Sequence, residues 1–276
     1  MKLKDEFRKM TSDLAARFTI PPIKRIFLPP FYSGGQPKDA QFMAIGLEGG
    51  AVGISFVLLS DEKKEEYRSL QPSDFVGKDP GGFALNLGDD DPLGEMIGMA
   101  ACNAICQHVV GETGFKVDHA TDSLGLLSIA RGDKVGMIGL FFGLFKTIVQ
   151  AGADLVVVER NERLIKKNPD LPITMDMKEL GTCNKILCTS MTVLNDSLDE
   201  VLSHCPSDAF VAVIGPTAGY FPDPLFARGV DVVGGRMVKS EDLFFQRLAE
   251  GKRWGDATRK TCFQKKTYTS VSEFSA

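Results

Sequence analysis

The sequence lacks several features that would place it in a functional class at once. Its longest apolar run, Val135 to Phe145, is too short to span a bilayer. Its first residues, Met1 to Glu6, lack the apolar core of a signal peptide. No basic stripe is visible and the formal net charge is -4, which argues against nucleic acid as a partner. We therefore expect a cytoplasmic protein with no membrane insertion and no nucleic-acid partner.

Familiar catalytic signatures are missing as well. The chain contains no P-loop, no nucleophile elbow and no Ser/His/Asp order. A dinucleotide fingerprint needs three glycines at fixed offsets, whereas here Gly139 and Gly143 bracket Leu-Phe-Phe. The pattern therefore favours a Rossmann-like turn more than it favours an NAD site.

The composition is that of a soluble globular protein, with 43% hydrophobic and 25% charged residues. A length of 276 residues suits one large domain or two ordinary ones. The six cysteines should be reduced thiols in a cytoplasmic protein and not a disulfide framework.

The first half has an α+β pattern. Apolar residues at helical spacing predict a helix over Leu3 to Phe18. Two apolar runs, Phe42 to Leu47 and Ala51 to Leu59, flank Glu48-Gly49-Gly50 and predict a hairpin. Pro92 suits the first turn of a further helix. We assign residues 1–120 to a smaller α+β domain.

Strict β/α alternation begins at Lys134, which predicts a parallel, doubly wound α/β sheet with right-handed crossovers. We assign residues 121–255 to this Rossmann-like domain, with a short connecting helix over Ser123 to Arg131. Residues 256–276 are expected to form a polar tail that frays. The predicted strands are Val135–Gly139, Asp154–Glu159, Lys185–Thr189, Phe210–Ile214 and Val230–Gly234.

Loops at the carboxyl ends of parallel strands collect ligand contacts. Three such loops are rich in glycines and small polar residues, which suits a polar ligand bound near helix amino termini. Helix capping is the alternative, above all for Asp196 and Ser197. Paired aromatics in the first loop also indicate a planar ligand. The candidate binding residues in these loops are Gly139, Phe141, Phe142, Thr189, Ser190, Asn195, Gly215, Pro216 and Thr217.

Two further groups carry a functional and a structural interpretation. Glu159 lies about twenty residues after Gly139, where Rossmann domains place a ribose-binding carboxylate. Glu159 and Asn161 could orient a ribose or a pterin-like ring, or they could be ordinary surface groups at a strand end. His119 lies beside carboxylates and is a weak candidate for a general acid or base.

Cys102 and Cys106 are the weak candidates for metal ligands, because thiols four residues apart share one face of a helix. The chain supplies no second cluster at zinc spacing, and small thiols on an alanine-rich helix usually serve packing.

The second half resembles the family described as "putative heavy-metal chelation", long catalogued as a domain of unknown function. The first half resembles its usual companion, whose fold is like the enolase amino-terminal domain. The matching stretches are Val135-Gly-Met-Ile-Gly139, Val158-Glu-Arg-Asn161, Thr189 to Asn195, Leu198 to Leu202, Ile214 to Ala218, Leu225 to Asp231 and Asp91 to Ala104.

The resemblance implies a cleft between the two domains and a role in making, cleaving or handling metal-chelating small molecules of pterin, flavin or siderophore type. It adds Asn103 of the first domain to the binding candidates. We expect an enzyme that condenses or hydrolyses such a molecule. It would then be a hydrolase, a lyase or a condensing enzyme. The alternatives are a non-enzymatic metal–chelator binding protein and an S-adenosylmethionine- or nucleotide-dependent enzyme. The expected partner is a small-molecule ligand, and the cofactor (a metal ion or an adenosine-containing ligand) and a homo-oligomeric state stay open.

Overall fold

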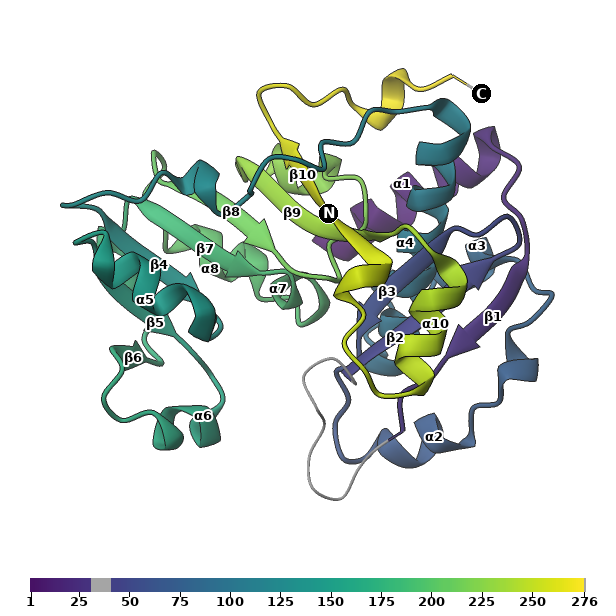
Figure 1. Ribbon diagram of the computed structural model, residues 1–276, viewed down its shortest axis with the longest axis horizontal. Coiled ribbons are helices and arrows are strands. Elements are labelled where there is room, and N and C mark those ends of the chain that lie inside the picture. Colours follow the sequence, from purple (N-terminus) through teal and green to yellow (C-terminus); the bar gives the residue numbers. More distant parts are fainter. Residues whose placement is uncertain (31–40, 276) are drawn as a thin grey trace.

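The computed structural model describes residues 1–30 and 41–275, and its strands form two sheets (Figure 1). The first sheet is antiparallel, in the order β1 (Ile23–Phe27), β2 (Phe42–Leu47) and β3 (Val52–Phe56). The second is mostly parallel and contains β4 (Lys134–Ile138), β5 (Asp154–Val158), β6 (Ile173–Thr174), β7 (Lys185–Thr189), β8 (Phe210–Ile214), β9 (Val232–Val238) and β10 (Thr258–Gln264). The α-helices are α1 (Leu3–Arg17), α2 (Lys64–Ser69), α3 (Pro80–Ala84), α4 (Pro92–Thr113), α5 (Phe142–Gln150), α6 (Glu162–Lys167), α7 (Met191–Leu194), α8 (Leu198–Ser203), α9 (Asp223–Ala227) and α10 (Glu241–Ala249).

Both faces of the first sheet are covered. Successive side chains of a strand point to opposite faces. In β2, Met43 and Ile45 pack in the main core with α1 and α4, whereas Phe42 and Ala44 pack with residues of α10. Every residue of β2 is consequently buried. The predicted hairpin of β2 and β3 is confirmed.

Helix α4 is the central, largely buried helix of the first half. The Asp91 side chain caps it by accepting a hydrogen bond from Gly94 N, and Pro92 occupies the first turn. The helix ends at Gly114, whose φ of 62° is left-handed. Most of its residues are buried, because it lies between the first sheet and helices α1 and α3.

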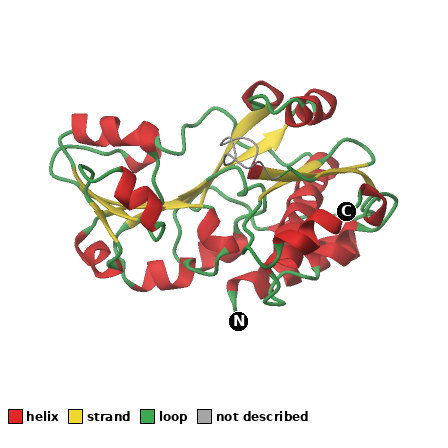
Figure 2. Cartoon of the chain, turned by 90° about the horizontal axis from the view of Figure 1, so that it is seen from below, coloured by secondary structure: helices red, strands yellow, loops and turns green. Residues whose placement is uncertain are grey.

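The second sheet has the strand order of a Rossmann fold. Its order is β10-β9-β8-β7-β4-β5-β6, and all neighbours are parallel except β9 and β10. Counted from β4, the six parallel strands read 3-2-1-4-5-6, and the order reverses between β4 and β7. Helices lie on both sides of this sheet (Figure 2). The predicted Rossmann-like, doubly wound sheet preceded by a smaller α+β part is confirmed, whereas the enolase likeness of that part stays a prediction.

The second half of the chain also completes the first sheet. After β9 the chain crosses over, and Phe244, Phe245 and Leu248 of α10 cover the outer face of the first sheet. Gln107 of α4 donates a hydrogen bond to the carbonyl oxygen of Val238, at the end of β9. The outer face would otherwise expose apolar side chains to water, so the two halves fold as one packed unit in this region.

Two expectations about segments differ from the structure. The tail predicted to fray from residue 256 instead contains β10, which pairs with β9 along its whole length. Beyond β10, Asp223 accepts hydrogen bonds from Tyr268 and Ser270. The connecting helix expected over residues 123–131 is only a 3-10 turn, Gly125–Leu127. Within residues 1–30 and 41–275, no helix has the length and apolar character needed to cross a membrane.

Candidate functional site

Two predicted binding residues meet where the strand order of the second sheet reverses. Gly139 follows β4 and Thr189 ends β7. Gly139 has a φ of 82°, and a Cβ added to it would lie 3.1 Å from Thr189 Cγ2. A side chain at Gly139 would therefore be both strained and crowded. The ends of the first two loops therefore lie close together, and their role in binding a ligand stays a prediction.

The third loop packs directly against the second. A Cβ added to Gly215 would lie 2.1 Å from Ser190 Oγ, and Ser190 is buried. Pro216 follows Gly215 and is partly exposed. Gly215 and Ser190 therefore hold the ends of β7 and β8 together by close packing.

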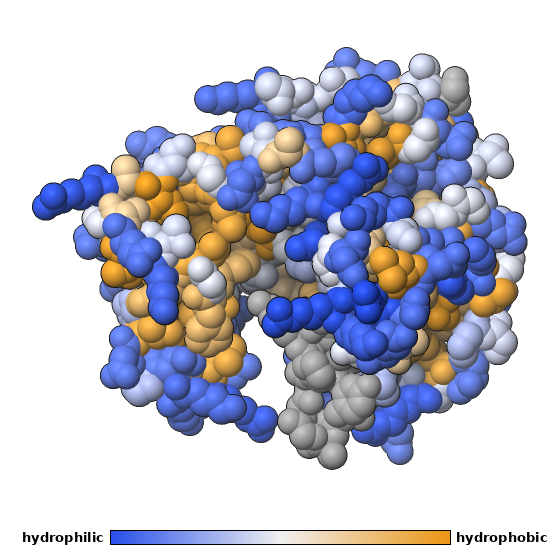
Figure 3. All heavy atoms as spheres, viewed as in Figure 1, coloured by the Kyte–Doolittle hydropathy of each residue, from blue (hydrophilic) through white to orange (hydrophobic). Residues whose placement is uncertain are grey.

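The paired phenylalanines lie at the start of α5. Phe142 is 54% exposed, and Phe141 is partly buried with its N–H directed at Met137 Sδ. On the face seen in Figure 3, hydrophobic side chains gather over the region of β4 and α5, whereas the region of α6 is largely hydrophilic. The structure thus leaves one aromatic face, Phe142, free to contact a ligand.

Glu159 and Asn161 have local hydrogen-bonding roles. A Glu159 carboxylate oxygen accepts from Asn161 N at 2.8 Å. Asn161 Oδ1 accepts from Arg163 N at 3.0 Å and so caps α6. Capping explains both side chains, and their role in binding a ribose stays a prediction.

Asn103 and Thr217 join the two halves of the molecule. Asn103 donates to the carbonyl oxygens of Ile54 at 2.7 Å and Thr217 at 2.8 Å. The Thr217 hydroxyl accepts from Phe56 N at 3.2 Å, and Thr217 is 1% exposed. Neither side chain faces solvent, so the candidate site does not include Asn103 or Thr217.

The weak metal and acid–base candidates lie elsewhere. Cys102 and Cys106 are buried in the core, and Cys102 Sγ accepts a hydrogen bond from Thr11. Burial raises the pKa of the Cys106 thiol above its ordinary value of 9.0, whereas the hydrogen bond with Cys106 lowers the pKa of Cys102. The two thiols are buried and lack further ligands, since the described part of the chain holds no group of three or more His, Cys, Asp or Glu suited to a metal ion. His119 contacts the carbonyl oxygen of Lys260 on β10.

A pocket of about 380 Å³ lies between the two halves. The first half contributes the loop after β3 and the start of α4, and the second contributes the turn after α7. Of the predicted binding residues, only Asn195 lines it. The lining residues are Leu58, Leu59, Ser60, Asp90, Pro92, Glu95, Met96, Leu194, Asn195 and Asp196.

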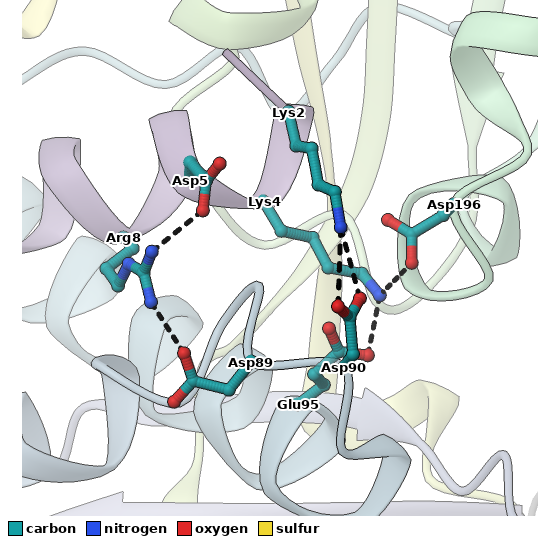
Figure 4. A network of polar contacts seen from close by, with 8 residues as sticks. All are labelled: Lys2, Lys4, Asp5, Arg8, Asp89, Asp90, Glu95 and Asp196. Carbon is teal, nitrogen blue, oxygen red and sulfur yellow. Dashed lines mark hydrogen bonds and ion pairs between the residues drawn. The ribbon is translucent and has the colours of Figure 1, made fainter.

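A cluster of charged side chains, drawn in Figure 4, contributes Glu95 and Asp196 to the lining of this pocket. Lys4 Nζ donates to Glu95 Oε2 and to Asp196 Oδ2, each at 2.6 Å. The side chains of Lys4 and Glu95 are 1% and 7% exposed, whereas that of Asp196 is 54% exposed. We call Lys4, Glu95 and Asp196 the interdomain triad, because they come from α1, α4 and the turn before α8.

The interdomain triad is not fully paired. Glu95 Oε1 is buried and has no hydrogen-bond partner within the described ranges. Nearby, Lys2 Nζ lies 3.2 Å from Asp90 Oδ1 in an exposed ion pair. Asp196 has a φ of 56°, an uncommon backbone conformation for a residue other than glycine.

Sequence reasoning missed this triad. Capping of α8 is the alternative interpretation of Asp196 and Ser197, but Ser197, the residue before α8, makes no side-chain capping hydrogen bond. Asn195 Oδ1 instead accepts from the N–H and hydroxyl of Ser197. One signal was present: Glu95 is the only charged residue between Pro92 and Gln107, in an otherwise apolar or small-residue helix.

Two solved structures share this fold. A protein of unknown function from Pyrococcus horikoshii is 17% identical, with a TM-score of 0.69 over 95% of this chain and 99% of its own. A protein of unknown function from Desulfitobacterium hafniense is also 17% identical, with a TM-score of 0.69 over 95% of this chain and 98% of its own. Among curated proteins there is no match.

Both of these structures come from one family, and the sequence of this chain matches that family independently. The match covers residues 122–267, more than half of the chain, which confirms the resemblance seen in the sequence. The protein therefore belongs to the family described as "Putative heavy-metal chelation".

Proposed function

We propose that this protein is a small-molecule enzyme that condenses or hydrolyses a chelator-like or heteroaromatic substrate in the pocket between its halves. The observation that carries the proposal is the buried carboxylate of Glu95, which lines this pocket and has one oxygen without a partner among residues 1–30 and 41–275. The volume of the pocket, about 380 Å³, lies in the range of small-molecule sites. Buried polar groups normally find partners, so an unpaired one in a pocket points to a ligand.

The family description supports a link to metals. The described side chains support an indirect link, in which these groups do not themselves hold the metal ion. Glu95 and Asp196 are both paired with Lys4, and the thiols of Cys102 and Cys106 lie in the core. We therefore place the metal chemistry in the small molecule that the protein handles, and we derive no step through a metal ion held by these groups.

The reaction can be tested by metabolite profiling. Purified protein is incubated with a small-molecule extract, and compounds that fall or rise in concentration are identified by mass spectrometry. The wild type should convert a compound that Glu95→Gln and Leu58→Trp convert much more slowly, since Leu58 lines the pocket and a larger side chain would fill it. A compound bound but not converted would favour the non-enzymatic binding protein, and conversion untouched by both variants would reject the pocket as the site.

A second candidate function is an adenosine-ligand-dependent enzyme. It is favoured by the reversal of strand order between β4 and β7, where Rossmann folds bind nucleotides, and by Gly139 at that point. Titration with S-adenosylmethionine and NAD tests it, with Gly139→Val as the disruptive variant. Gly143→Ala is the matched control, because space is open around Gly143.

A further inference from the structure

The interdomain triad carries an excess of negative charge. Two carboxylates, Glu95 and Asp196, share the single ammonium group of Lys4. The remaining acid of the pocket lining, Asp90, has its own exposed partner in Lys2. Lys2 also interacts electrostatically with Asp196, so two lysines face three carboxylates and one negative charge of this group is left over.

Glu95 combines a place in the pocket lining with a carboxylate oxygen that lacks a donor among the described residues. Glu95 Oε2 receives the hydrogen bond from Lys4, whereas Oε1 is buried with no donor among the described residues. A buried carboxylate oxygen without a donor is costly, more so when it belongs to an ionised group. A ligand that brings an N–H group to this oxygen would remove that cost.

The rest of the pocket lining is largely apolar. Leu58, Leu59, Met96 and Leu194 contribute hydrocarbon surface on both sides of the domain boundary. Leu58 is 38% exposed, so part of this wall is open to solvent. Such surface gains from contact with an apolar ligand body.

We propose that the pocket binds small organic cations, in which an amidinium or primary ammonium group on an apolar body donates a hydrogen bond to Glu95 Oε1. This inference rests on the proposed function, because it names the ligand class of the same pocket. The cation supplies the missing positive charge, its N–H group supplies the missing donor, and its body packs against the leucines and Met96.

The test compares three probes of similar shape by isothermal titration calorimetry with the full chain. Benzamidine is a cation with N–H donors, benzamide is neutral and benzoate is an anion. Benzamidine should bind, benzamide should bind at least about tenfold more weakly, and benzoate should show no binding, because charge-assisted hydrogen bonds to a buried carboxylate are the stronger ones. Raising the salt concentration should weaken benzamidine binding only modestly, since a buried pair is screened little.

Glu95→Gln should weaken benzamidine binding by about 10- to 100-fold, since it removes the charge and keeps the shape. The matched control is Glu112→Gln, an exposed acid at the other end of α4, which should leave the affinity unchanged. If Glu95→Gln does not fold, Leu58→Trp serves instead, and it should abolish benzamidine binding by filling the pocket.

The outcomes separate this inference from the proposed function. Equal or tighter binding of benzamide or benzoate, lost in Leu58→Trp, would overturn the cation class while the pocket stays a small-molecule site. Benzamidine binding that is unchanged in Glu95→Gln would overturn the inference, and binding that also survives Leu58→Trp would place the ligand outside this pocket. No binding of benzamidine would also overturn it, and the metabolite-profiling experiment would still decide the proposed function independently.

Discussion

Lys4 Nζ lies 2.6 Å from Glu95 Oε2, although 91 residues separate the two in the sequence. The contact joins the first turn of α1 to the first turn of α4, and Asp196 attaches the second half of the chain to the same ammonium group. A buried ion pair adds little net stability, because desolvation of both charges offsets their attraction. Losing one member is nevertheless expensive, since the other charge stays buried without a partner.

Lys4→Met should therefore destabilise the protein by about 3–5 kcal/mol, because it leaves Glu95 buried and uncompensated. Urea denaturation measures this as a lower free energy of unfolding. Lys9→Met on the same helix is the control, because Lys9 is exposed and its ion pair with Asp13 is exposed as well. It should change the free energy of unfolding by less than about 1 kcal/mol. Equal effects of the two variants would contradict the buried position of Lys4.

The second sheet was predictable because its strands are short apolar runs separated by helices and polar turns. The predicted Lys185–Thr189 and Phe210–Ile214 match β7 and β8 at both ends. Parallel strands buried on both faces need such runs, so the local sequence carries the information. The surface against which α10 packs was not predictable in this way. Its partner face is formed by residues of β2 almost two hundred positions earlier.

The interdomain triad was hidden for the same reason. Lys4 and Asp196 are 192 residues apart, and no spacing rule relates them. Asp196 also lies just before a helix, where an aspartate is expected to be a cap. By contrast, Gly139 and Thr189 were recognised because each lies at the carboxyl end of a strand, and parallel strands end at one edge of a sheet.

Gly139→Ala should destabilise the protein by about 1–2 kcal/mol, because an L-residue pays this to adopt a left-handed backbone. Contact with Thr189 Cγ2 adds to the cost. The control is Gly111→Ala, an exposed position within α4 with open space around it. Alanine is the better helix former, so the control should leave stability unchanged or raise it by up to about 1 kcal/mol. Thermal or urea unfolding of the two variants measures the difference. Equal stability of Gly139→Ala and Gly111→Ala would show that the backbone at Gly139 is not left-handed.

Thr217→Val should cost about 1–3 kcal/mol of stability, because valine leaves Phe56 N without its acceptor. Valine closely matches threonine in shape, so packing should be little changed. Thr147→Val, on the exposed side of α5, should change the free energy of unfolding by no more than about 0.5 kcal/mol. If Thr217→Val changed the free energy of unfolding as little as the control does, the Thr217 hydroxyl would not link the two halves. The prediction that Thr217 binds a ligand would then be favoured again.

Stability at low pH should depend on Asp91, the cap of α4. Hydrogen bonds from Lys63 and from the backbone N–H of Gly94 lower the pKa of Asp91 from its ordinary value of 3.8. Because the folded-state pKa is depressed, its contribution to stability is present above 3.8 and lost as the pH falls through the lower, folded-state value. Asp91→Asn keeps a capping oxygen but removes the charge. The variant should therefore be less stable than the wild type at pH 7, and the difference should shrink towards about pH 2. Urea midpoints measured across this range test the sign, with Asp208→Asn in an exposed loop as the control. A difference that stayed constant with pH would show that the Asp91 charge does not stabilise the start of α4.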